Sequence, residues 1–387
     1  MIISPLLQLA VDKNVSDIFF TVGAPINLKV DGVMQPANAQ VLDAEGIKRI
    51  AYELMTPEQA ATFESTLEIN FSFRVLGVGN FRVNIFRQRG TLAIVIRYIR
   101  AKIPNIEELN LPLILNQLVM EKRGLILAVG ATGSGKSTTL AAMLEYRNYT
   151  QTGHILTIED PIEYLFRHNK SLVNQREVGG DTVSYGHALS SAMREAPDVL
   201  MIGEIRDRET LKHGLIFSQT GHLCLSTMHA NNSYHALNRI ANFFPHDERQ
   251  AILSDLSLSL RAVVSQRLIP STTGKLIPAV EILLNTSLIS NLIKNDEIDK
   301  IREAIEKSMS PGSQTFEQAL VKLYKAGKIS KDEALRNADS ASNISSLIDF
   351  SQTTKMKSFG SQHSGTETAD AGSGFDTIKL NIDKPGT

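Results

Sequence analysis

The sequence is short of cysteine, tryptophan and net charge. A single cysteine, Cys224, excludes an internal disulfide and a cysteine-based zinc module, and is typical of a reducing compartment. Lysine plus arginine number 40 and aspartate plus glutamate 41, so the formal net charge is −1, which argues against a strongly basic nucleic-acid-binding protein. With no tryptophan and 6% aromatic residues, few side chains are present on which bases could stack. We therefore expect no nucleic acid partner.

Long hydrophobic runs are also missing. No apolar run reaches the roughly 18 residues that a membrane-spanning helix needs. Residues 1–17 carry no positively charged region and meet Asp12 too early for a secretory signal. The hydrophobic content of 42% is that of an ordinary globular protein, and 387 residues suffice for two or three domains. We expect a cytoplasmic protein without direct membrane insertion, whose contact with a membrane goes through a partner.

Residues 1–100 have the pattern of a small α+β domain. A short apolar helix is expected over 5–13, and Thr56-Pro57-Glu58 indicates the start of another. Glycines separate strand-like runs as turns do. The strands expected are 17–22, 26–30, 69–75, 80–86 and 91–98. A linker follows at 101–105, which includes Pro104.

From residue 106 to 285, short apolar runs alternate with helical segments, which predicts an α/β core with a parallel sheet. Residues 247–268 have helical apolar spacing and are expected to form a packing helix. Residues 286–350 read as mostly helical, and residues 351–387, rich in Ser, Thr and Gly, as a disordered tail. The core strands expected are 125–129, 155–158, 199–202, 223–227 and 277–283.

A phosphate-binding loop follows the first of these core strands. Its residues, which match G-x-x-x-x-G-K-[ST], are Gly130, Ala131, Thr132, Gly133, Ser134, Gly135, Lys136 and Ser137, with Thr138 next. The strand before it and the helix expected after it are the context that this motif requires. Glycines let backbone N–H groups surround phosphate oxygens, Lys136 reaches the β- and γ-phosphates, and the Ser137 hydroxyl can bind Mg²⁺. We expect ATP and Mg²⁺ here.

An acid follows the strand expected at 199–202. A Walker B strand ordinarily ends in Asp followed by Glu, whereas here Gly203 takes the Asp place and Glu204 the Glu place. We therefore expect Mg²⁺ to be held by Ser137, phosphate oxygens and water. Glu204 is the favoured general base or water-positioning acid. A solvated glutamate at the start of a loop is the alternative.

Further acids follow the strand expected at 155–158. Asp160-Pro161 keeps the backbone extended or turning, so Glu159, Asp160 and Glu163 stay near the strand end. One of them is expected to orient water or metal, and spacing favours Glu163. An ordinary acidic turn is the alternative.

A histidine and two arginines complete the candidates. His229 follows the strand expected at 223–227 and lies on the ligand edge, whereas His222 precedes it, at the opposite end. Arg82 and Arg97 lie on neighbouring expected strands of the first domain. Such arginines can stabilise phosphate charge. The alternative for the histidine is a structural role. The alternative for the arginines is a solvated position.

Four motifs in this order resemble those of the type II/IV secretion-type ATPases, and within them the type IV pilus retraction ATPases of the PilT/PilU family. They are GATGSGKST at 130–138, TIEDPIEY at 157–164, DVLMIGEIRD at 198–207 and TGHLCLSTMHANN at 220–232. The similarity runs from residue 1 to about 350. It implies a PAS-like N-terminal domain, a RecA-like P-loop ATPase core and a hexameric ring with nucleotide between the two domains.

The resemblance also implies roles for single residues. Glu163 and Glu204 match the catalytic acids of the family, and His229 matches its nucleotide-sensing histidine. Arg82 and Arg97 match N-terminal arginines that close on the phosphates.

Within the family, the chain looks closest to the PilU branch. The single cysteine argues against the assembly ATPases, which carry a tetracysteine zinc module. Residues 288–294 read LISNLIK, without the arginines of the PilT motif, and 314–320 and 333–340 look like PilU.

The resemblance implies an ATP-hydrolysing motor that supports pilus retraction and twitching motility as an accessory to a PilT-like motor. It would act on a PilC-like platform protein and lie peripherally at the inner membrane. A nucleotide-binding regulatory adaptor with little turnover is the alternative.

Overall fold

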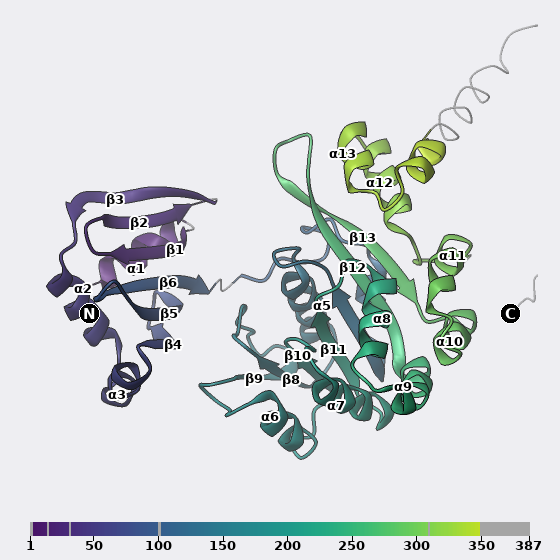
Figure 1. Ribbon diagram of the computed structural model, residues 1–387, viewed down its shortest axis with the longest axis horizontal. Coiled ribbons are helices and arrows are strands. Elements are labelled where there is room, and N and C mark those ends of the chain that lie inside the picture. The colour runs from purple at the N-terminus through teal and green to yellow at the C-terminus, as the bar shows by residue number, and fades with distance from the viewer. Residues whose placement is uncertain (1–2, 14, 31, 100–101, 309, 349–387) are drawn as a thin grey trace, which may run out of the picture.

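The computed structural model describes residues 3–13, 15–30, 32–99, 102–308 and 310–348 (Figure 1). They form an N-terminal lobe around one sheet and a larger lobe around a second sheet. The tail expected at 351–387 lies outside the described residues, as does residue 101 of the expected linker.

The N-terminal lobe is a six-stranded antiparallel sheet in the order β3-β2-β1-β6-β5-β4. One hydrophobic core lies between this sheet and its helices. Thr56 caps α3 through a capping box with Gln59, as the expected helix start requires. The elements are α1 (Ser4–Asp12), β1 (Val15–Thr21), β2 (Pro25–Val30), β3 (Val33–Val41), α2 (Ala44–Leu54), α3 (Pro57–Thr66), β4 (Glu68–Val75), β5 (Gly79–Gln88) and β6 (Thr91–Ile99).

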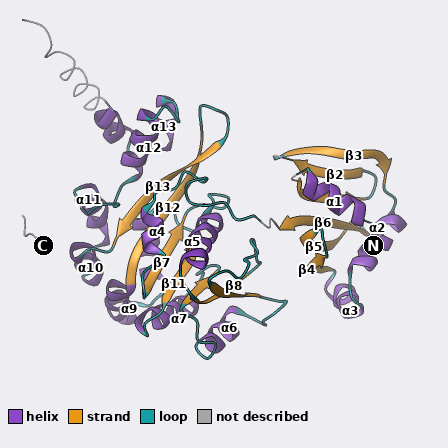
Figure 2. Ribbon diagram, turned by 180° about the vertical axis from the view of Figure 1, so that it is seen from behind, coloured by secondary structure: helices purple, strands orange, loops and turns teal. Residues whose placement is uncertain are grey.

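The second lobe is built on a seven-stranded sheet in the order β13-β12-β7-β11-β10-β8-β9. All neighbouring pairs are parallel except β12–β13. From the front, α7, α8 and α9 cover the sheet, and from behind, α4 and α5 do (Figures 1 and 2). The predicted fold class, an α/β core with a parallel sheet after a small α+β domain, is confirmed. Its elements are α4 (Ile114–Leu118), β7 (Gly124–Val129), α5 (Lys136–Thr150), β8 (Gly153–Glu159), β9 (Ser171–Glu177), α6 (Tyr185–Ala192), β10 (Val199–Ile202), α7 (Arg208–Gln219), β11 (Leu223–Met228), α8 (Ser233–Asn242), α9 (His246–Ser259), β12 (Leu260–Pro270) and β13 (Leu276–Leu284).

The packing helix expected over 247–268 is wrong in its second half. The helix α9 ends at Ser259, and residues 260–270 form strand β12 beside β7. Ala262, Val263 and Val264 are completely or almost completely buried there. A short apolar run with β-branched residues suits a buried parallel strand, and periodicity alone does not distinguish it from a buried helix. Strand β12 places Gln266 beneath the phosphate loop.

The C-terminal region is helical, and its last part packs on the β12–β13 hairpin. Phe316 and Leu320 of α12 and Ile344 of the helical residues 341–348 share a small core with Ile269 of β12. The elements are α10 (Ser287–Lys294), a 3₁₀ turn (Ile298–Lys300), α11 (Ile301–Glu306), α12 (Phe316–Lys325) and α13 (Lys331–Asn337).

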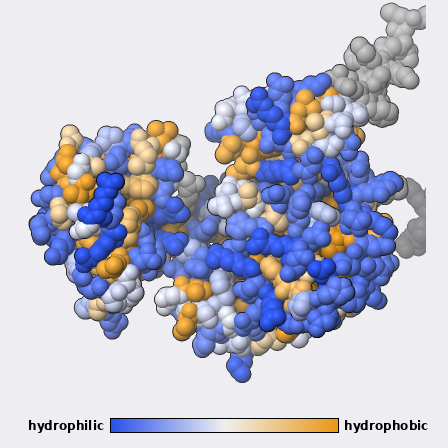
Figure 3. Space-filling model, in the orientation of Figure 1, coloured by the Kyte–Doolittle hydropathy of each residue, from blue (hydrophilic) through white to orange (hydrophobic). Residues whose placement is uncertain are grey.

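Hydrophobic surface is divided into separate patches on the face shown in Figure 3, with several on the N-terminal lobe. On that lobe, Val33, Met34 and Val41 of the edge strand β3 are exposed. Among the helices of the described residues, none has both the length and the apolar character needed to cross a membrane.

Candidate nucleotide site

The carboxyl ends of the central parallel strands meet at one edge of the second sheet. β7 and β11 end at the same level, because Val129 pairs with Met228; Val129 also pairs with Ser265 of β12, which continues to Pro270. Ile202, at the end of β10, pairs with Ile158 of β8. The residues after these strands therefore share the edge where parallel sheets bind ligands. A pocket of about 450 Å³ opens there, and its walls include Lys136, Ser137, Thr138, Glu163, Glu204 and His229.

Glycines let loop 130–135 close tightly over β12. A β-carbon at Gly130 would lie 2.4 Å from Ser134 Oγ and 2.5 Å from the Gln266 carbonyl oxygen. Gly135 has a φ of +89°, and a β-carbon there would lie 2.7 Å from Gln266 Nε2. Such approaches and such a φ favour glycine. The loop passes directly into α5, whose N-terminal N–H groups and dipole favour an anion.

Lys136 is held inside the loop. Its Nζ donates to the carbonyl oxygens of Gly130 at 3.0 Å and Ala131 at 2.9 Å, and the residue is 8% exposed. Burial lowers the pKa of Lys136, while Glu204 and Glu163 act in the opposite direction. Among the described residues it forms no ion pair with a carboxylate, so its charge is available to an anionic ligand. Ser134 Oγ, nearby in the loop, is buried and has no hydrogen-bond partner within the same residues.

Glu204 is held from both sides at the end of β10. Its Oε2 lies 2.7 Å from Arg206 Nε, and its Oε1 lies 3.2 Å from His229 Nε2. The Glu204 side chain is 12% exposed. The structure thus brings Glu204 and His229 together in the pocket. His222 lies at the other end of β11, where its Nδ1 is close to Thr220 Oγ1 and the Phe217 carbonyl oxygen.

The three acids at and after the end of β8 occupy different environments. Glu159 is 6% exposed, and its Oε1 accepts hydrogen bonds from Thr157 Oγ1 at 2.7 Å and Gln175 Nε2 at 3.2 Å. Burial raises the pKa of Glu159 to about 7, although these hydrogen bonds act against the shift. Asp160 and Glu163 are exposed and also line the pocket. Asp160 and Glu163 are thus the acids of this loop that face both pocket and solvent.

Arg82 and Arg97 lie directly opposite each other on β5 and β6. Arg97 Nε lies 2.7 Å from Oδ1 of Asp17, a buried carboxylate of β1. Both arginines line a separate hollow of about 280 Å³ together with Glu163. The two arginines therefore share this hollow with Glu163, but neither of them lines the pocket at the phosphate loop.

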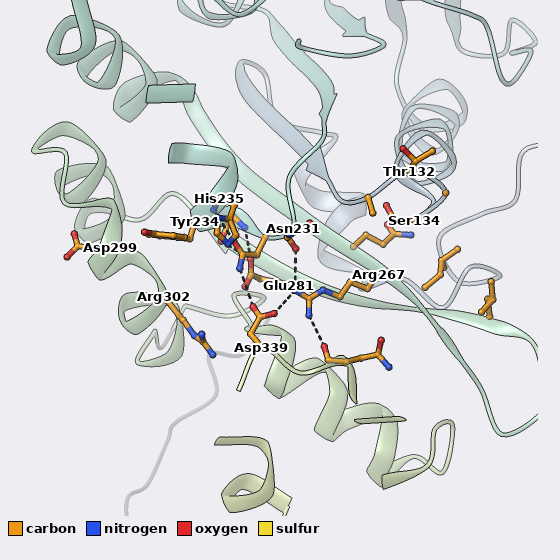
Figure 4. A pocket seen from close by; sticks show the side chains of 18 residues that line it. Thr132, Ser134, Asn231, Tyr234, His235, Arg267, Glu281, Asp299, Arg302 and Asp339 are labelled. Atoms are coloured by element: carbon orange, nitrogen blue, oxygen red, sulfur yellow. Dashed lines mark hydrogen bonds and ion pairs between the residues drawn. The ribbon is translucent and has the colours of Figure 1, made fainter. Parts of the chain in front are cut away.

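A larger hollow of about 930 Å³ lies on the other side of the loop, toward the C-terminal helices (Figure 4). Figure 4 shows Arg267 and Asp339 side by side in its wall, and the distance between Nη2 and Oδ1 is 2.5 Å. The Arg267 guanidinium also stacks 3.9 Å from the Phe316 ring centroid. None of Lys136, Glu163 and Glu204 lines this hollow, so we place the chemistry in the smaller pocket.

The sequence profile of the type II/IV secretion system protein family matches residues 1–332. The chain belongs to this family.

Two relatives within the family are described as type IV pilus ATPases. The type IV pilus ATPase PilU of Pseudomonas aeruginosa is 47% identical over 344 residues, which cover 89% of this chain and 90% of PilU. The type IV pilus retraction ATPase PilT of the same organism is 40% identical, over 89% of this chain and 100% of PilT. The crystal structure of the pilus retraction motor PilT with bound ADP matches with a TM-score of 0.81 at 39% identity, over 87% of this chain and 97% of that chain. The predicted family is confirmed.

Three residues at the pocket or under its loop were not predicted from the sequence of this type II/IV secretion system protein. Gln266 lies under the loop and accepts a hydrogen bond from Thr139 Oγ1 at 2.6 Å through Oε1. Arg206 holds Glu204, and Tyr185 lines the pocket from α6. Arg206 carried a signal, because it follows Glu204 by two residues. Gln266 was not recognised because it lies in the part of β12 that was expected to be helical. No sequence pattern indicated Tyr185.

Proposed function

We propose that this chain binds Mg-ATP on loop 130–138 and hydrolyses it. The observation that carries the proposal is the pocket itself, in which the buried amine of Lys136 faces the Glu204–His229 pair. The residues suit a triphosphate in two further respects. Ser134 Oγ is a buried hydroxyl without a partner in the described part of the chain, and Gly130 and Gly135 spare the loop the clashes that β-carbons would make with Ser134 and Gln266.

In this proposal, loop 130–138 binds the phosphates. Lys136 would exchange the Gly130 and Ala131 carbonyl oxygens for phosphate oxygens, which are stronger acceptors because they are charged. Within the described residues no group of three or more His, Cys, Asp or Glu side chains could hold a metal ion. Ser137 would therefore hold Mg²⁺ together with phosphate oxygens and water. Mg²⁺ neutralises developing phosphate charge when it is bound.

Glu204 is proposed as the residue that orients the attacking water. Arg206 and His229 fix its two oxygens, and each oxygen keeps a further lone pair for a water. Glu163, on the opposite wall, is the second acid. His229 would report on the terminal phosphate through its contact with Glu204. Arg82 and Arg97 would reach the phosphates when the lobes close, because they already line a hollow shared with Glu163.

We further propose that hydrolysis supports type IV pilus retraction and twitching motility, as an accessory to a PilT-like motor. The support is the identity to PilU and PilT over most of all three chains. The working form would be a cytoplasmic hexamer at the inner membrane, acting on a PilC-like platform protein.

The test measures Mg-ATP binding and hydrolysis by the purified full-length chain and by three variants, in which one acid or one of two histidines is replaced. Glu204→Gln is expected to keep Mg-ATP binding and to lower steady-state hydrolysis by about 10²- to 10⁴-fold. His229→Ala should also lower hydrolysis, whereas His222→Ala, at the far end of the same strand, should not. In cells, the Glu204→Gln chain should fail to support retraction under load. If the wild-type chain binds ATP without turning it over, the regulatory adaptor replaces the motor.

A further inference from the structure

Gly203 leaves an open position at the end of β10, where a Walker B strand ordinarily carries aspartate. The backbone there still follows the neighbouring strand, because Gly203 N donates to the Ile158 carbonyl oxygen at 2.7 Å. A β-carbon at Gly203 would lie 2.7 Å from the Tyr185 hydroxyl oxygen and 3.2 Å from Glu159 Cα. Tyr185 therefore occupies the space that an aspartate side chain would enter.

Tyr185 reaches this space from a different element. It is the first residue of α6, and its ring packs against the core of the second lobe. Its side chain is part of the wall of the nucleotide pocket, together with Glu204 and Lys136. Among the described residues, its hydroxyl has no hydrogen-bond partner. A fixed ring with a free hydroxyl in a polar pocket is suited to contact a ligand.

Burial and the surrounding acids keep the Tyr185 hydroxyl protonated. Burial raises the pKa of Tyr185 above its ordinary value, and the nearby Asp160, Glu159 and Glu204 raise it further, while Arg206 acts in the opposite direction. A neutral phenol offers one O–H donor and an acceptor oxygen. It can therefore accept a hydrogen bond from a water, as an aspartate would, and also donate to a carboxylate.

We propose that the Tyr185 hydroxyl replaces the missing aspartate of the Walker B strand. Its oxygen would accept a hydrogen bond from a water of the Mg²⁺–nucleotide complex, and its O–H would donate a hydrogen bond to one of the surrounding carboxylates. The proposal rests on the proposed function, because it requires nucleotide on the loop. Tyr185 is thus a positioning residue for the metal's water.

The test measures metal dependence of nucleotide binding in the full-length chain. Binding of a fluorescent ADP analogue is titrated with Mg²⁺ in the wild type, in Tyr185→Phe and in Tyr149→Phe. Tyr149 is an exposed tyrosine at the end of α5 and serves as the matched control. Loss of one hydrogen bond predicts that Tyr185→Phe needs about 3- to 10-fold more Mg²⁺ for half-maximal binding. Binding in EDTA and the thermal midpoint should not change, and Tyr149→Phe should match the wild type throughout.

The possible results distinguish a failure of the Tyr185 proposal from a failure of the proposed nucleotide site. An unchanged Mg²⁺ requirement in Tyr185→Phe overturns the role of the hydroxyl. An equal loss of binding with and without Mg²⁺ also overturns it, because that result indicates packing alone. If the wild-type chain itself does not bind the analogue, the proposed nucleotide site fails and this inference fails with it.

Discussion

Replacing Glu159 by glutamine should make the protein more stable above neutral pH. Glu159 lies under the acidic loop, and within the described residues no lysine or arginine forms an ion pair with it. Burial raises its pKa from the ordinary 4.5 to about 7 in the folded protein. Between these values the folded chain holds the proton and the unfolded chain loses it. The free energy of unfolding therefore falls as pH rises through this window, and levels off above it.

The size of the effect follows from the two pKa values. The difference between 4.5 and about 7 corresponds to about 3 kcal/mol, at about 1.4 kcal/mol per pH unit. Most of this, about 2 to 3 kcal/mol, is lost between pH 5 and pH 8. Glutamine at position 159 keeps an acceptor oxygen for Thr157 and Gln175 but carries no titrating proton. Glu159→Gln should therefore be close to the wild type at pH 5 and more stable by up to about 3 kcal/mol at pH 8.

Urea unfolding at pH 5, 6, 7 and 8, followed by circular dichroism, measures this difference. Glu107→Gln, at an exposed glutamate of the second lobe, controls for the loss of one acid and should show no such pH dependence. A difference between Glu159→Gln and the wild type that stays constant from pH 5 to pH 8 refutes the reasoning. So does a variant that is less stable than the wild type at pH 8.

Three further perturbations test other parts of the structure. Arg267→Ala leaves Asp339 without its ion-pair partner, and since both side chains are only about one-fifth exposed, we expect a loss of about 2 kcal/mol, seen as faster hydrogen exchange in residues 316–339. Gly135→Ala places a β-carbon against Gln266 at a φ of +89°, and should weaken nucleotide binding about tenfold, measured with a fluorescent ADP analogue. Burial raises the pKa of Cys224 to about 12, so iodoacetamide should label this thiol only after urea unfolding; rapid labelling of the folded chain contradicts the buried position.

The sequence predicted the central parallel strands well because each is a short apolar run between loops. Residues 199–202 form β10 with the same bounds, and residues 125–129 lie within β7. Two of the strands that were missed, β3 and β9, have no such pattern. Every residue of β3 but one is exposed, and β9 is a polar edge strand. Neither buries enough apolar surface for periodicity to reveal it.

The same contrast holds for the candidate site. Loop 130–138 was predicted because its chemistry lies in consecutive residues, and Glu204 because it comes two residues after the last residue of a strand. Tyr185 reaches the pocket from α6, and Gln266 of β12 lies against the loop at Gly130 and Gly135, so only the tertiary arrangement reveals them. Their positions depend on which helix and which strand pack beside the loop, and local sequence patterns do not predict that packing.

The central claim is tested most directly by the binding of Mg-ATP to the wild-type chain and to Lys136→Ala, measured by isothermal titration calorimetry. Removing the amine deletes the buried cation of the loop, and the α5 backbone remains intact because alanine is a good helix former. We predict saturable binding by the wild type, a loss of at least about tenfold in affinity for Lys136→Ala, and the same thermal midpoint for both without nucleotide. Equal affinity of the two chains for Mg-ATP would contradict the account.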